Sequence, residues 1–168
     1  MIKIIKKNKG FTLLEIMIAV LLMVLIARLT IPATIEFYNS QITKSTADEV
    51  FSTLKKAQAF ALTRRGDSGY GVIFNPNSED FFVLFRGDSY NPNDSVNEIF
   101  NLYGLSVEFL PPTPNNNSIY FENATGFPNW TGIITLSKGN VSEQISICEN
   151  SGLVEFGNNC VDDIVQQP

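Results

Sequence analysis

Two short strings resemble the surroundings of catalytic serines. Gly66-Asp67-Ser68-Gly69 has the order found around serine-protease nucleophiles, and Gly87-Asp88-Ser89 resembles the start of a lipase-like block. In both enzyme classes a histidine takes the proton of the serine hydroxyl. The chain has no histidine. We therefore interpret both strings as tight turns and predict that the protein is not an enzyme.

The polar segment 88–98 contains oxygen ligands that a calcium ion could use. The candidate ligands are Asp88, Asn91, Asn93, Asp94 and Glu98. Their spacing lacks the glycine of an EF-hand loop. The absence of histidine also excludes the usual zinc sites. We interpret the segment as a solvated loop and predict neither a metal site nor a cofactor.

Two cysteines, Cys148 and Cys160, lie close together near the C-terminus. The residues between them include glycines and asparagines, which allow the chain to turn back. An even number of cysteines behind an export-like N-terminus favours a disulfide formed in an oxidising compartment. Two reduced, buried thiols are the alternative.

Composition and charge limit the class of protein. The chain has 168 residues, of which 44% are hydrophobic and 17% charged, enough for one modest domain and one long additional element. The net charge is −5, and Arg86 and Lys138 are the only basic residues after Arg65. Nucleic-acid binding requires clustered lysine and arginine, so we predict no nucleic-acid partner.

The N-terminus combines a basic leader with an apolar stretch. Four lysines precede Gly10, and the apolar residues run from Phe11 to Ala27 with Glu15 among them. This length is close to the minimum of about 17 residues for crossing a bilayer, and Arg28 can reach the interface. An acidic residue at the centre of a membrane helix costs about 2.5–3.5 kcal/mol, which indicates that Glu15 has a use. We predict a membrane-spanning segment over 11–32 with the lysines on the cytoplasmic side.

The heptapeptide Lys9-Gly10-Phe11-Thr12-Leu13-Leu14-Glu15 closely resembles the processing signal of type IV prepilins and type II secretion pseudopilins. The resemblance implies that prepilin peptidase cleaves between Gly10 and Phe11 and methylates the new terminus. It also implies that Glu15 pairs with the Phe11 amine of a neighbouring subunit. The implied partners are other pilin subunits, an inner-membrane assembly platform and membrane lipid. The implied location is the bacterial inner membrane, with the head in the periplasm or exterior, and later a pilus or pseudopilus.

Periodicity predicts a long helix followed by strands. Apolar residues recur at helical spacing to about Thr63, and Pro32 is expected to bend the helix. Alternating or apolar aromatic runs predict strands at 70–74, 81–85, 105–109, 118–121, 132–137, 144–148 and 153–156. The predicted fold is α+β and pilin-like, with one long N-terminal helix packed on a C-terminal antiparallel sheet. The predicted segments are a leader (1–10), a membrane and filament-core helix (11–32), an amphipathic helix (33–65) and a β-rich head (66–168).

The head is moderately similar to the GspH/FimT type of minor pseudopilin. The similarity lies in a helix ending AQAFALTRRG, the strand pair GYGVIFNP and DFFVLFRG, and the segment ISICENSG. This implies a minor pilin or pseudopilin, a structural subunit of a type II secretion pseudopilus or type IV pilus. A FimT-like subunit for DNA uptake and an adhesive minor pilin are the alternatives.

Overall fold

The computed structural model describes residues 10–75, 78–112, 117–149, 151–157 and 160, without the side chains of 29–33. The leader predicted over 1–10 therefore lies outside the described residues except for Gly10. The chain forms two compact units, Met1–Phe37 and Tyr38–Pro168.

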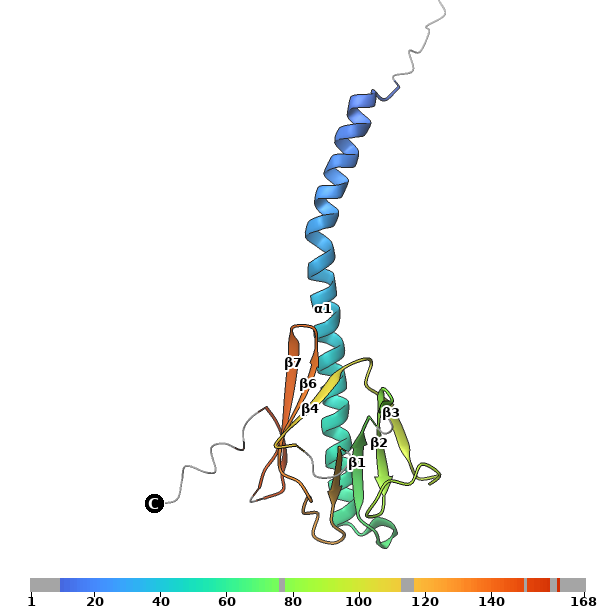
Figure 1. The fold of residues 1–168 in the computed structure, drawn as a ribbon, viewed down its shortest axis with the longest axis vertical. Coiled ribbons are helices and arrows are strands. Elements are labelled where there is room, and N and C mark those ends of the chain that lie inside the picture. The colour runs from blue at the N-terminus through green and yellow to red at the C-terminus, as the bar shows by residue number, and fades with distance from the viewer. Residues whose placement is uncertain (1–9, 76–77, 113–116, 150, 158–159, 161–168) are drawn as a thin grey trace, which may run out of the picture. The chain divides into compact units, whose positions relative to one another are not determined.

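One helix, α1 (Leu13–Leu62), accounts for almost all of the helical structure (Figure 1). It ends one residue before the predicted Thr63, and the helical backbone continues through Pro32. The expected bend at Pro32 stays a prediction. In the part of the chain that the structure describes, no helix is both long enough and apolar enough to cross a bilayer. The membrane-spanning segment predicted over 11–32 includes residues 29–33, whose side chains lie outside the described residues, and it stays a prediction.

The second half of α1 buries one face against strands. Its fully buried apolar residues recur every three or four positions, which places them on one stripe: Ala47, Val50, Leu54, Ala57 and Ala61. They belong to one hydrophobic core with buried residues of six strands, and β3 and β4 contribute partly buried residues. This confirms the predicted packing of an amphipathic helix on a β-rich head.

The strands form two antiparallel sheets of four strands each (Figure 1). The first has the order β3 (Glu98–Asn101), β2 (Phe81–Arg86), β1 (Tyr70–Phe74) and β5 (Ser118–Phe121). The second has the order β4 (Ser106–Leu110), β6 (Gly132–Lys138), β7 (Val141–Ile147) and β8 (Val154–Phe156). The α+β class and the antiparallel arrangement are confirmed.

Strand β3 is the main difference between the structure and the prediction. The sequence predicts a solvated loop over 88–98 and no strand over 98–101, whereas β3 occupies Glu98–Asn101. Four residues with two polar ends carry a weak strand signal. Their partners stabilise them: the Phe100 ring stacks on Phe82 at 5.0 Å, and the Glu98 carboxylate binds the Lys56 ammonium. Both contacts join residues far apart in the sequence, so the local pattern does not reveal them.

Candidate functional site

The junction between Gly10 and Phe11 lies open just ahead of α1. Phe11 is 79% exposed. A Cβ atom added at Gly10 would meet no atom of the described residues within 4 Å. The described part of the fold therefore gives no steric reason for a glycine at this position.

Thr12 caps the N-terminus of α1, a role that the sequence reasoning missed. Its Oγ1 accepts a hydrogen bond from the Glu15 backbone N–H at 3.2 Å, and its carbonyl oxygen accepts one from the Ile16 N–H. A threonine followed three positions later by glutamate is the signature of a capping box, so Thr12-x-x-Glu15 could have revealed it. The cap places the Glu15 carboxylate in the first turn, where the helix dipole favours negative charge.

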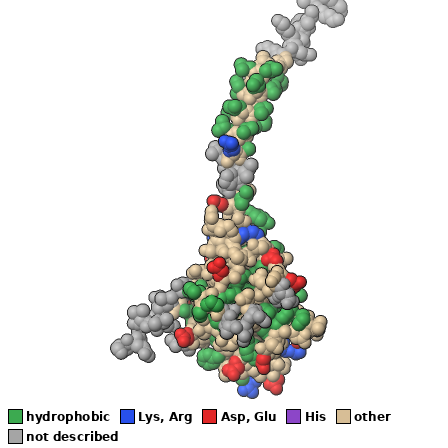
Figure 2. All heavy atoms as spheres, viewed as in Figure 1, with side chains coloured by type: hydrophobic (Ala, Val, Ile, Leu, Met, Phe, Trp, Pro, Cys, Tyr) green, Lys and Arg blue, Asp and Glu red, His purple; other side chains and the backbone are tan. Residues whose placement is uncertain are grey.

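From Ile16 to Ile26, α1 carries apolar side chains on every side. The side chains of all its large hydrophobic residues from Leu13 to Ile26 are at least 51% exposed. Figure 2 shows these hydrophobic side chains covering the N-terminal part of the helix. One face forms a shallow apolar hollow, lined by Ile16, Met17, Val20, Leu21, Val24, Leu25 and Arg28. A helix that is hydrophobic all round requires apolar surroundings.

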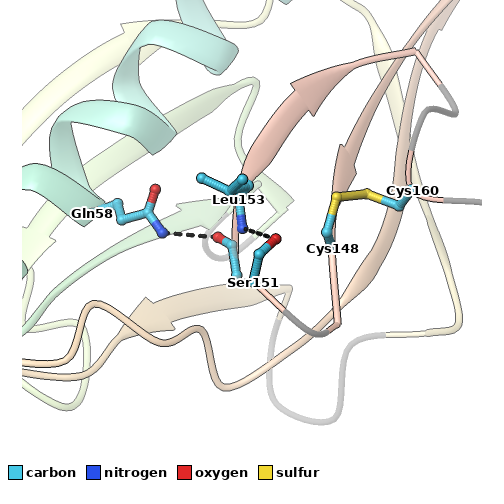
Figure 3. Close-up of a disulfide and its surroundings, with 6 residues drawn as sticks. Gln58, Cys148, Ser151, Leu153 and Cys160 are labelled. Atoms are coloured by element: carbon cyan, nitrogen blue, oxygen red, sulfur yellow. Dashed lines mark hydrogen bonds between the residues drawn. A yellow bond between two sulfur atoms is a disulfide. The ribbon is translucent and has the colours of Figure 1, made fainter. Parts of the chain in front are cut away.

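Cys148 and Cys160 form the disulfide that the sequence predicts, with their Cα atoms 5.2 Å apart (Figure 3). The bridge joins the residue after β7 to the chain beyond β8. Gln58 of α1 also holds this region, because its side-chain amide donates to the Gly152 carbonyl at 2.8 Å. The hydrogen bond from Gln58 and the disulfide together hold the segment between β7 and β8 in place.

The candidate calcium ligands of segment 88–98 have separate partners. Glu98 binds Lys56, Asp94 lies 3.7 Å from an Arg86 nitrogen, and Asp88 accepts a hydrogen bond from Tyr120. Among the residues that the structure describes, no group of three or more histidine, cysteine, aspartate or glutamate residues could hold a metal ion.

The contact between Tyr120 and Asp88 joins β5 to the loop after β2. The Tyr120 hydroxyl donates to Asp88 Oδ1 at 2.6 Å. Burial, followed by the hydrogen bond and the negative charge of Asp88, raises the pKa of Tyr120 to about 12. Because the raised pKa keeps Tyr120 a neutral phenol near neutral pH, the contact favours a structural clamp over proton transfer.

Both serine-containing strings lie in turns, as predicted. Gly66 and Gly87 adopt positive φ angles of 70° and 103°, a conformation that glycine adopts readily. Gly66 belongs to the short 3₁₀ helix η1 (Arg65–Asp67), which follows α1, and Gly87 follows β2.

Residues 5–27 match the model of the prokaryotic N-terminal methylation motif. No curated protein and no solved structure matches the chain. The match confirms the resemblance of the N-terminal segment to type IV prepilin-like precursors. It supports processing by prepilin peptidase and assembly with other pilin subunits, and proteins with this motif are structural. It does not extend to the head, so the GspH/FimT type is not established.

Proposed function

We propose that the protein is a structural subunit of a pilus-like filament, made as a precursor and cleaved between Gly10 and Phe11. The observation that carries this proposal is the methylation motif over residues 5–27, followed at once by a capped, apolar helix. The leader and the apolar helix then have different tasks: the leader is removed, and the helix packs among other subunits.

The cap explains why Glu15 suits assembly. Cleavage creates an α-amino group on Phe11, next to the positive end of the helix dipole. A carboxylate that neutralises this amine would remove an unfavourable charge from an apolar bundle. Glu15 of a neighbouring subunit can do so, because the Thr12 cap holds Glu15 in the exposed first turn. The pair would also set the register between subunits.

Before assembly, the apolar N-terminal part of α1 would hold the precursor at the inner membrane. Lysines of the leader favour the cytoplasmic side, which leaves the head on the other side. The disulfide is compatible with that compartment, because the periplasm is oxidising. Membrane lipid and an inner-membrane assembly platform are the partners that this route requires.

The head favours a minor subunit of the GspH/FimT type. Support comes from the amphipathic half of α1, the paired strands β1 and β2, and the β7 segment that leads into β8. The filament could belong to a type II secretion pseudopilus or to a type IV pilus. Arg86 lies near Asp94, and the Lys138 ammonium donates to the Tyr103 carbonyl, so both basic head residues already have partners. This disfavours the DNA-uptake alternative relative to an adhesive one.

The test is the intact mass of the full-length chain co-expressed with a prepilin peptidase. We expect a product that lacks Met1–Gly10 and carries one added methyl group. Gly10→Val should block cleavage without disturbing the fold, because no atom of the described residues lies near the Gly10 Cβ position. An unprocessed wild-type chain, in cells where the same peptidase cleaves a control substrate, would contradict the proposal.

Glu15→Gln separates cleavage from assembly. This variant should be cleaved and methylated normally, since the Thr12 cap uses the backbone N–H of residue 15. It should fail to enter filaments, because it cannot neutralise the Phe11 amine. Normal recovery of the variant in sheared filaments would show that the carboxylate is not needed for assembly.

A further inference from the structure

The two turns described above contain the same four residues. The first copy, Arg65-Gly66-Asp67-Ser68, follows α1, and the second copy, Arg86-Gly87-Asp88-Ser89, begins at the last residue of β2. The fold brings the two copies together: a Cβ atom added at Gly66 would lie 3.4 Å from Arg86 Nη1. The Gly87 N–H also donates to the Gly69 carbonyl at 2.9 Å.

The second copy is occupied by contacts within the head. Arg86 lies 3.7 Å from the Asp94 carboxylate, and Asp88 accepts the Tyr120 hydroxyl. Arg86 also packs against the Gly66 backbone of the first copy. These contacts use the Arg and the Asp of the second copy to support the first.

The first copy is exposed and its charged groups remain accessible. Residues 64–67 are all exposed. Within the described part of the chain, no hydrogen bond, ion pair or ring contact engages the Asp67 carboxylate. The Arg65 guanidinium carbon lies 4.2 Å from the centre of the Phe60 ring. Stacking uses the face of the guanidinium and leaves its N–H edge available for a carboxylate.

The backbone of the first copy is fixed in a tight turn. The Asp67 N–H donates to the Arg64 carbonyl at 3.0 Å, and Gly66 and Asp67 have φ angles of 70° and 53°. Helix α1 and strand β1 hold the two ends. Gly66 suits this turn through its φ angle, which L side chains rarely adopt, whereas a Cβ atom there would make only ordinary contact with Arg86. A rigid turn loses little entropy on binding, which favours recognition by a partner.

We propose that Arg65-Gly66-Asp67 is an adhesion site for a cell-surface receptor that recognises the Arg-Gly-Asp tripeptide. Such a receptor presents a bound divalent cation to the aspartate carboxylate, a hard oxygen ligand, and carboxylates to the arginine. The first copy offers both groups from one rigid turn. The second copy has the same sequence, but its Arg86 and Asp88 side chains each have a partner within the head, and it serves as support for the first copy.

The experiment measures binding of the full-length chain, in detergent micelles, to an immobilised integrin ectodomain that binds Arg-Gly-Asp peptides, with magnesium present. We expect saturable binding that a Gly-Arg-Gly-Asp-Ser peptide and EDTA both abolish. Asp67→Asn should weaken binding by at least roughly tenfold, as expected for loss of a charged, cation-bound group.

Asp88→Asn is the matched control, because it removes a carboxylate from the other copy while its amide oxygen can still accept from Tyr120. This variant should bind within about twofold of wild type. Unchanged circular dichroism and thermal unfolding would confirm that both variants fold. Binding that Asp67→Asn retains, binding that Asp88→Asn loses equally, or no peptide-sensitive binding by the wild-type chain would each overturn the proposal.

Discussion

The two parts of α1 differ in how far their apolar residues are exposed to solvent. From Leu13 to Ile26 the large hydrophobic side chains are at least 51% exposed, whereas five apolar residues from Ala47 to Ala61 are fully buried. The second part has a narrow apolar stripe that one domain can cover. The first part is apolar all round, and its large hydrophobic residues are exposed. The same helix therefore meets its own head at one end and requires other molecules at the other.

The largest effect should come from removing a side chain of the buried stripe. Leu54→Ala should lower the free energy of unfolding by about 2–5 kcal/mol, because it leaves a cavity under both sheets. Leu21→Ala is the matched change in the exposed part, and it should leave unfolding of the head unaltered. Fluorescence of buried Trp130 during denaturation of the chain in micelles measures both variants. Equal destabilisation by Leu54→Ala and Leu21→Ala would contradict the difference in burial between the two parts of α1.

The next effect concerns the disulfide, which stabilises only the head. Reduction, or the double change Cys148→Ala and Cys160→Ala, should cost about 3 kcal/mol, because cross-linked residues 12 apart restrict the unfolded chain. The denaturation midpoint with and without reductant measures this loss. The double variant should show no response to reductant; a response would mean that the reductant acts elsewhere.

A smaller effect should follow from breaking the Tyr120 clamp. Tyr120→Phe leaves the Asp88 carboxylate without its donor and should cost about 1–2 kcal/mol. The folded pKa of about 12 lies above the ordinary value of 10.0. The clamp's contribution is therefore fully present below pH 10 and is lost as pH rises toward 12. The stability difference between wild type and variant, followed over this range, should shrink; a constant difference would argue against the clamp.

The smallest effect belongs to the helix cap. Thr12→Ala should destabilise the first turn of α1 by about 1 kcal/mol, whereas Thr12→Ser keeps the oxygen acceptor. Amide hydrogen exchange should quicken at Glu15 in the alanine variant alone. Exchange that quickens equally in both variants would show that the hydroxyl is not the cap.

Much of the N-terminal site could be predicted from the sequence because its determinants are contiguous. The glycine before the apolar run, the acidic residue within it and the helical periodicity can all be read locally. Thr12 was missed although its spacing to Glu15 carries the signal. The membrane-spanning segment over 11–32 stays a prediction, because the side chains of residues 29–33 lie outside the described part of the chain.

The sequence by itself determined the processing motif, the long helix, most of the strands and the capacity for a disulfide, because each depends on neighbours along the chain. Only the tertiary structure decided that β3 joins the first sheet, that there are two sheets, and which of two identical Arg-Gly-Asp-Ser turns has an Asp carboxylate without a partner among the described residues. Two copies of one tetrapeptide have the same local chemistry. Their difference arises from Asp94, Tyr120 and Phe60, which the fold brings to them from distant or separate elements.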